Sequence, residues 1–74
     1  IATREKRRLE KELAALEERI HNLESEIRQM DAALANPADH PDVADAAWFA
    51  RYAANKLEAE RLMAEWEKQL EDLN

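Results

Sequence analysis

The stretch Leu9–Leu34, LEKELAALEERIHNLESEIRQMDAAL, carries apolar side chains in alternating steps of four and three residues. The positions are Leu9, Leu13, Leu16, Ile20, Leu23, Ile27, Met30 and Leu34. A mean spacing of about 3.5 residues keeps one side of an α-helix facing a partner helix. The stretch therefore predicts one helix of a coiled coil, which we expect to run from about residue 3 to residue 35.

Two prolines mark the connection to a second helix. Pro37 lacks a backbone N–H and disfavours the helical conformation at Asn36, so the first helix is expected to end there. Pro41 suits the first turn of a new helix, with Asp42 near its positive end. We expect a turn over 36–40 and a second helix over about 41–73. The predicted fold is all-α, an antiparallel two-helix coiled-coil hairpin that forms a single domain over residues 1–74.

The apolar row of the second helix is less regular than that of the first. Its best match is Phe49, Tyr52, Lys56, Ala59, Met63, Trp66, Leu70 and Leu73, with Trp48 and Leu62 on one flank. A fold-back near residue 39 places Met63 beside Leu16 and Phe49 beside Met30. Leu57 lies off this row and has no assigned contact.

The charges beside the first apolar row argue against a parallel dimer of this helix. Three of its four flanking pairs would be repulsive, and only Arg19 with Glu24 would attract. The repulsive pairs are Glu5 with Glu10, Glu12 with Glu17, and Glu26 with Asp31. We therefore expect a monomeric hairpin.

The composition narrows the possible functions. The 74 residues include no glycine and no cysteine, which excludes glycine-rich phosphate loops, disulfides and thiolate metal sites. A net charge of −6 disfavours nonspecific attraction of polyanions to the surface as a whole. No signal peptide or membrane-crossing apolar run is recognisable. The chain begins at Ile1, so we expect a fragment of a larger, cytoplasmic protein.

Catalysis requires polar groups that converge in a concave site, which a two-helix hairpin does not offer. We therefore expect no enzymatic activity in these residues. Glu17 and His21 lie one turn apart and are a conceivable metal pair, but a solvated histidine is the plainer interpretation. His40 falls in the turn. We expect no metal or cofactor in this chain.

Basic residues gather at the N-terminal end, at Arg4, Lys6, Arg7, Arg8 and Lys11. Five basic and two acidic residues give residues 1–11 a local charge of +3, whereas the other 63 residues carry −9. One interpretation is a solvated helix start. The other is a patch that contacts the phosphates of a nucleic acid.

An aromatic group lies near the turn and comprises Trp48, Phe49 and Tyr52, with Arg51 among them. It would either cap the tip of the hairpin or form a stacking surface for bases or for a partner protein.

Several short stretches match one known pattern. Residues 2–10, ATREKRRLE, are similar to an opening Ser-Tyr-Lys-Glu-x-Arg-Glu-Leu-Glu segment, although Thr3 replaces the tyrosine. The other matches are a heptad helix at 20–27, a Leu-x-Asp-Pro-like turn at 34–37, and a second-helix end at 57–60 and 66–71. Together these stretches resemble the C-terminal coiled-coil domain of the ABC-F subfamily of ATP-binding-cassette ATPases.

The resemblance implies an accessory arm that binds DNA, ribosomal RNA or tRNA and supports an ATPase core, whose ATP and Mg²⁺ sites would lie outside these residues. Our leading hypothesis is a noncatalytic arm of this kind that contacts nucleic acid or the ribosome and has no membrane partner. Its candidate phosphate contacts are Arg4, Lys6, Arg7, Arg8, Lys11 and Arg51. The alternatives are a protein-interaction or spacer coiled coil, and a tRNA-contacting arm of an aminoacyl-tRNA synthetase.

Overall fold

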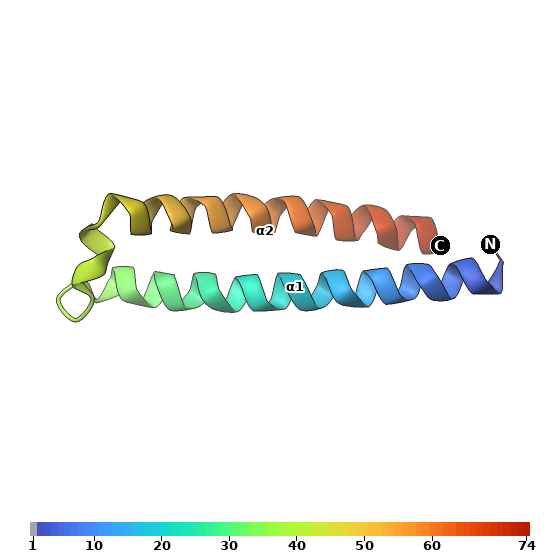
Figure 1. Ribbon diagram of the computed structural model, residues 1–74, viewed down its shortest axis with the longest axis horizontal. Coiled ribbons are helices and arrows are strands. Elements are labelled where there is room, and N and C mark those ends of the chain that lie inside the picture. Colours follow the sequence, from blue (N-terminus) through green and yellow to red (C-terminus); the bar gives the residue numbers. More distant parts are fainter. Residues whose placement is uncertain (1) are drawn as a thin grey trace.

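Two antiparallel helices lie side by side along a rod of 55 × 15 × 15 Å in the computed structural model, which describes residues 2–74 (Figure 1). Helix α1 spans Thr3–Ala35 and helix α2 spans Ala46–Leu73. A single 3-10 turn, η1, spans Pro41–Ala44 between them. The predicted all-α helical hairpin is therefore confirmed.

Helix α1 has the predicted bounds and buries the predicted row. The Asn36 N–H donates to the Ala33 carbonyl at 3.2 Å and closes the last turn before Pro37. Along the row, Leu13, Leu16, Ile20 and Met30 are buried, whereas Leu9, Leu23, Ile27 and Leu34 are partly exposed. Ala33 is buried beside them.

Helix α2 begins later than expected. The prediction of a continuous α-helix from about residue 41 is wrong, because Pro41 starts the short η1 and α2 starts only at Ala46. Asp45 has extended backbone angles, and its carboxylate accepts a hydrogen bond from the Ala47 N–H at 2.9 Å. An aspartate that caps a helix in this way interrupts the helix on its N-terminal side.

The buried row of α2 also differs from the predicted one. The residues turned towards α1 are Trp48, Tyr52, Asn55, Ala59, Leu62, Trp66, Gln69 and Leu73, all buried or partly buried. Four of these were predicted: Tyr52, Ala59, Trp66 and Leu73. The predicted Phe49, Met63 and Leu70 are instead 52%, 44% and 37% exposed.

Charge and size explain the choice between these rows. The predicted row would place the Lys56 ammonium at the interface, whereas the observed row places the neutral amides of Asn55 and Gln69 there. Moving a charge from water towards an apolar interior costs more than moving an amide that has a partner. Asn55 Nδ2 lies 3.6 Å from Met30 Sδ and Gln69 Nε2 donates to Glu65 at 3.4 Å, whereas Gln69 Oε1 is buried without a partner among the described residues. The observed row also buries Trp48, the largest side chain available.

The core consists of two clusters along the rod. One contains Leu16, Ile20 and Leu62, with Leu23 and Trp66 packed against it. The other, near the turn, contains Met30, Ala33 and Trp48, with Leu34, Val43 and Tyr52 packed against it. Leu62 and Trp48 thus take the places predicted for Met63 and Phe49, and the order of the layers along the rod is as predicted.

Candidate nucleic-acid interface

Four of the predicted phosphate contacts share one face of α1. Arg4, Arg7, Arg8 and Lys11 stand at positions i, i+3, i+4 and i+7, which lie on one side of an α-helix. Together with Thr3 they line one surface hollow. We call these four residues the basic stripe.

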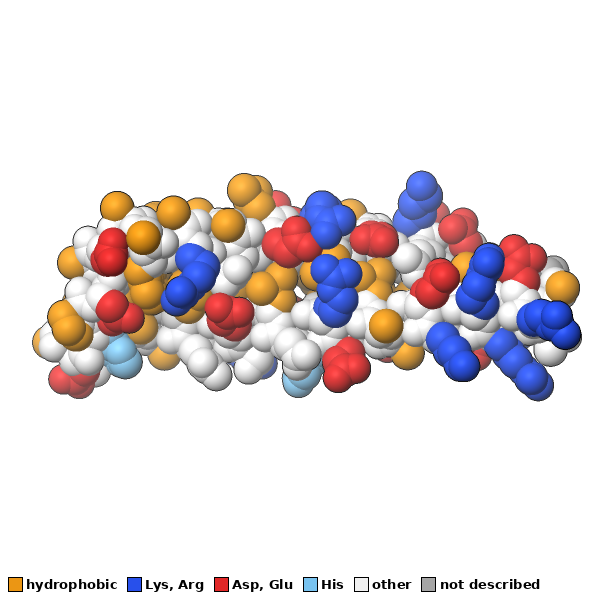
Figure 2. Space-filling model, viewed as in Figure 1, with side chains coloured by type: hydrophobic (Ala, Val, Ile, Leu, Met, Phe, Trp, Pro, Cys, Tyr) orange, Lys and Arg blue, Asp and Glu red, His pale blue; other side chains and the backbone are white. Residues whose placement is uncertain are grey.

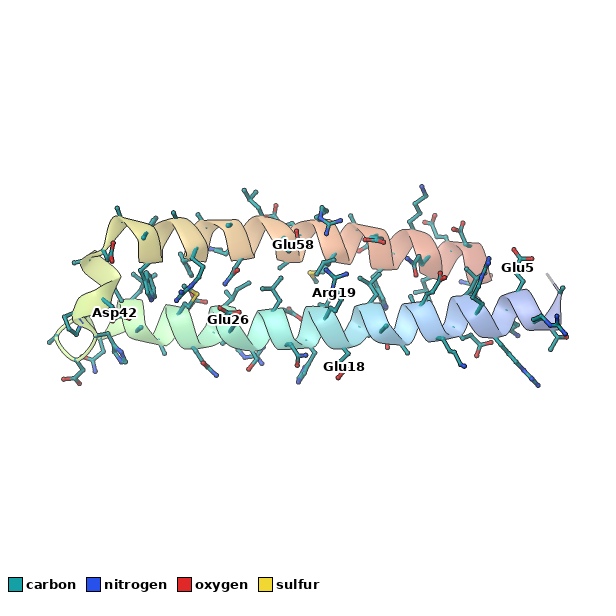
Figure 3. All side chains as sticks on the ribbon, viewed as in Figure 1. Glu5, Glu18, Arg19, Glu26, Asp42 and Glu58 are labelled. Atoms are coloured by element: carbon teal, nitrogen blue, oxygen red, sulfur yellow. The ribbon has the colours of Figure 1, made fainter. Side chains whose placement is uncertain are left out.

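The basic stripe faces away from α2. Glu18 follows Lys11 by seven residues, and Figure 3 shows its side chain on the side of α1 opposite α2. Helix α1 also extends past the end of α2 at this end of the rod (Figure 1). In Figure 2, Lys and Arg side chains gather along α1 at this end, with Asp and Glu side chains next to them on the side of α2. A ligand therefore reaches the stripe without meeting α2.

The cations of the stripe are exposed and have no carboxylate partner among the described residues. The ion pairs found within residues 2–74 join Arg19, Glu58, Arg61 and Glu65 only. Binding a phosphate at the stripe would therefore break no internal ion pair.

Two predicted contacts lie outside the stripe. Lys6 is two residues from both Arg4 and Arg8, a separation that places it on another face of α1. Arg51 lies on α2 one turn after Trp48, which packs beside Met30. Met30 is 19 residues beyond Lys11, about 28 Å along the rod at 1.5 Å per residue, and Arg51 lies one turn nearer to the stripe, about 24 Å from it along the rod.

The aromatic group at the turn is mostly part of the core. Trp48 is buried and stacks on Tyr52, with ring centroids 5.8 Å apart and an interplanar angle of 13°. The Tyr52 hydroxyl donates to Asp31, and Lys56 Nζ lies 5.2 Å from the Tyr52 ring centroid. Phe49 alone is exposed among the aromatic residues of the group. The capping interpretation therefore holds for Trp48 and Tyr52.

Glu17, which with His21 is a conceivable metal pair, contacts the other helix instead. The Glu17 carboxylate accepts a hydrogen bond from Trp66 Nε1 at 2.9 Å and so links the two helices. His21 and His40 are both exposed. Within residues 2–74, no three His, Cys, Asp or Glu side chains are grouped so that they could hold a metal ion.

A second charged group lies between the helices and was not predicted. Arg61 donates to both carboxylate oxygens of Glu58, at 3.0 and 2.5 Å, and Arg19 of α1 lies 3.7 Å from the same carboxylate (Figure 3). The hydrogen bond from Arg61 lowers the pKa of Glu58, and that carboxylate raises the pKa of Arg61. Glu58 and Arg61 are three residues apart on one helix, a spacing that predicts an ion pair from the sequence alone.

No helix within residues 2–74 combines the length and apolar character needed to cross a membrane. Comparison of the chain with protein-family models, with curated proteins and with solved structures finds no match.

Proposed function

We propose that this hairpin is a noncatalytic nucleic-acid-binding arm and that the basic stripe is its phosphate-binding surface. The observation that carries the proposal is the stripe itself: three arginines and one lysine on one exposed face, with no internal ion pair among the described residues. Arginine suits this role because its planar guanidinium binds phosphate through two hydrogen bonds.

The charge is distributed unevenly over the hairpin. The rest of the chain is strongly acidic, and α2 brings Glu67, Glu71 and Asp72 to the same end of the rod, so a polyanion is attracted to the outward face of α1 at that end and repelled elsewhere. Phosphate contacts alone carry no sequence information. The binding should therefore be independent of sequence and strongly dependent on salt.

The proposal also includes a parent protein, an ABC-F ATPase. A hairpin of this kind in an ABC-F ATPase would support two ATPase domains that hold ATP and Mg²⁺, and would contact DNA, ribosomal RNA or tRNA in the cytoplasm. The resemblance supports this part of the proposal, and the full coding sequence tests it. Two ATPase cassettes before these residues are expected, whereas a synthetase core would identify the tRNA-contacting alternative.

A charge-matched pair of variants tests the stripe. The first variant replaces Arg4, Arg7, Arg8 and Lys11 by glutamine. The control replaces Lys6, Arg28, Arg51 and Lys68 by glutamine, which removes the same charge from exposed positions outside the ion pairs. Binding to labelled duplex DNA, single-stranded DNA and RNA is measured by fluorescence anisotropy over a range of salt concentrations.

We expect the stripe variant to lose most of its affinity and the control to keep most of it. Each phosphate neutralised contributes about −0.9 to the slope of log affinity against log salt for duplex DNA, so four contacts contribute about −3.6. Equal losses in both variants would show that only net charge matters, and would contradict the assignment of the stripe. Absence of binding by the unmodified chain would reject the proposed function.

A further inference from the structure

Helix α2 carries a second row of side chains that the hairpin leaves uncovered. This exposed row consists of Phe49, Lys56, Met63 and Leu70, which repeat every seven residues beside the buried row. Its three apolar members keep 52%, 44% and 37% of their surface exposed. A repeat of seven residues along one edge matches the contact line of another helix lying along the rod.

Two members of the exposed row, Lys56 and Met63, border a shallow groove between the two helices, and Phe49 and Leu70 continue the row beyond its two ends. One hollow of the groove is lined by Met63, Trp66, Ile20, Glu17, His21 and Glu24. The next is lined by Lys56, Ala59, Glu60, Ile27, Arg28 and Glu24. Since both hollows share Glu24, they follow one another along a single side of the hairpin. The groove floor is apolar, at Ile20, Ile27 and Ala59, and its rims are polar.

Glu17, Glu24 and Glu60 line the groove, and further carboxylates continue the two rims at intervals of seven residues. On the α1 side they repeat every seven residues, at Glu10, Glu17, Glu24 and Asp31. Glu17 is fixed by Trp66 and Asp31 by Tyr52, so this rim is ordered by the same aromatic residues that hold the helices together. On the α2 side, Glu60 and Glu67 stand beside the exposed row. Arg28 and Lys56 are the basic residues near the middle of the groove.

From this arrangement we propose that the groove is a docking site for an amphipathic helix of another protein, with an apolar stripe flanked by Lys and Arg on both sides. The apolar stripe covers Phe49, Met63 and Leu70, and the flanking cations meet the carboxylates of the two rims. An acidic residue in the middle of that helix would face Lys56. A second copy of this chain does not fit, because it would bring its own acidic rims and a net charge of −6 against the same carboxylates.

The test uses the whole 74-residue chain and two synthetic probes. The first probe is a 21-residue helical peptide with leucines at heptad positions a and d and with Lys and Arg at e and g. The second has the same leucines and glutamates at e and g. Binding is measured by fluorescence anisotropy of the labelled peptide, and self-association of the chain by sedimentation equilibrium.

Met63→Gln and Leu57→Gln form a matched pair of variants. Leu57 is an exposed leucine at 68%, but it lies off the row and away from the groove. We expect Met63→Gln to weaken binding of the basic peptide by about tenfold, a change of one decade in Kd. Replacing Phe49, Met63 and Leu70 together by glutamine should abolish the binding. Leu57→Gln should leave it unchanged, and the acidic peptide should bind at least about tenfold more weakly than the basic one.

Because the replaced side chains are exposed, the variants should keep the helical circular dichroism of the unmodified chain. A further double variant, Glu24→Gln with Glu60→Gln, keeps the apolar row. It should weaken binding of the basic peptide and not that of the acidic peptide. Equal effects of Met63→Gln and Leu57→Gln, equal binding of both peptides, or absence of binding would overturn the proposal. Self-association that the triple variant abolishes would also overturn it, because the occupant would then be a second copy.

Discussion

Helices α1 and α2 contribute to the same interface but differ in how strongly their sequences specify the buried side. Helix α1 has one apolar row, and that row is buried. Helix α2 has two overlapping rows that share Tyr52, Ala59, Trp66 and Leu73, and the structure buries the one with Trp48 and Leu62. A regular period therefore identifies the contact side of a helix only when no neighbouring row has the same period.

The largest effect is expected at the turn end, where the two rows of α2 differ most in size. Trp48→Ala removes a buried indole from the cluster with Met30 and Ala33, and a change of this type costs about 3–5 kcal/mol. We expect this loss to unfold so small a hairpin. Phe49→Ala, one residue away but half exposed, should leave it folded. Thermal unfolding followed by circular dichroism compares the two, and similar losses would contradict the assigned row.

The same comparison can be made at mid-rod with a smaller expected effect. Leu62 is 1% exposed, whereas Met63 is 44% exposed. Leu62→Ala should cost about 2–4 kcal/mol, because it leaves a cavity between Leu16 and Ile20. Met63→Ala should cost less than about 1 kcal/mol, since an exposed side chain loses little packing. Urea unfolding gives both values. A larger loss for Met63→Ala would indicate the predicted row instead.

The start of α2 offers a third comparison, between its two aspartates near the turn. The Asp45 carboxylate accepts from the Ala47 N–H, so Asp45→Ala should cost about 1 kcal/mol of helix stability. Asp42, in the first turn of η1, makes no such contact among the described side-chain hydrogen bonds, and Asp42→Ala should change stability by less. Urea unfolding measures both. A greater loss for Asp42→Ala would support the predicted start of the helix at residue 41.

The smallest effect concerns pH and the exposed cluster of Glu58 and Arg61. The pKa of Glu58 in the folded chain lies below its ordinary value of 4.5, mainly because of the hydrogen bond from Arg61. The contribution of ionised Glu58 to the free energy of unfolding is therefore complete when the pH is above that ordinary value. It is lost as the pH falls through the pKa of the folded chain. Glu58→Gln should lower the melting temperature slightly at pH 7, and the difference from the unmodified chain should vanish at acid pH. A difference that grows on acidification would contradict this linkage.

Much of the fold could be predicted because its signals are local. The bounds of α1 and the turn at Asn36 follow from heptad spacing and from the backbone chemistry of Pro37. The start of α2 was missed, because Pro41 and Asp45 are both plausible starts and the side chain of Asp45 provides the cap. The prediction grouped Arg4, Arg7, Arg8 and Lys11 with Lys6 by their position in the chain, although their spacing already separates them from Lys6. Their freedom from ion pairs within residues 2–74 and the direction of their shared face, away from α2, needed coordinates.

The sequence by itself determined that two helices form, where the first of them ends, and that they fold back on each other. These features depend on propensities and periods that each segment carries alone. Only the tertiary structure decided which row of α2 faces α1, because that choice depends on the apolar surface and polar groups that both helices bury together. It buries the large Trp48, partly buries the neutral Asn55 and keeps the ammonium of Lys56 in water, which leaves Phe49, Met63 and Leu70 on the surface.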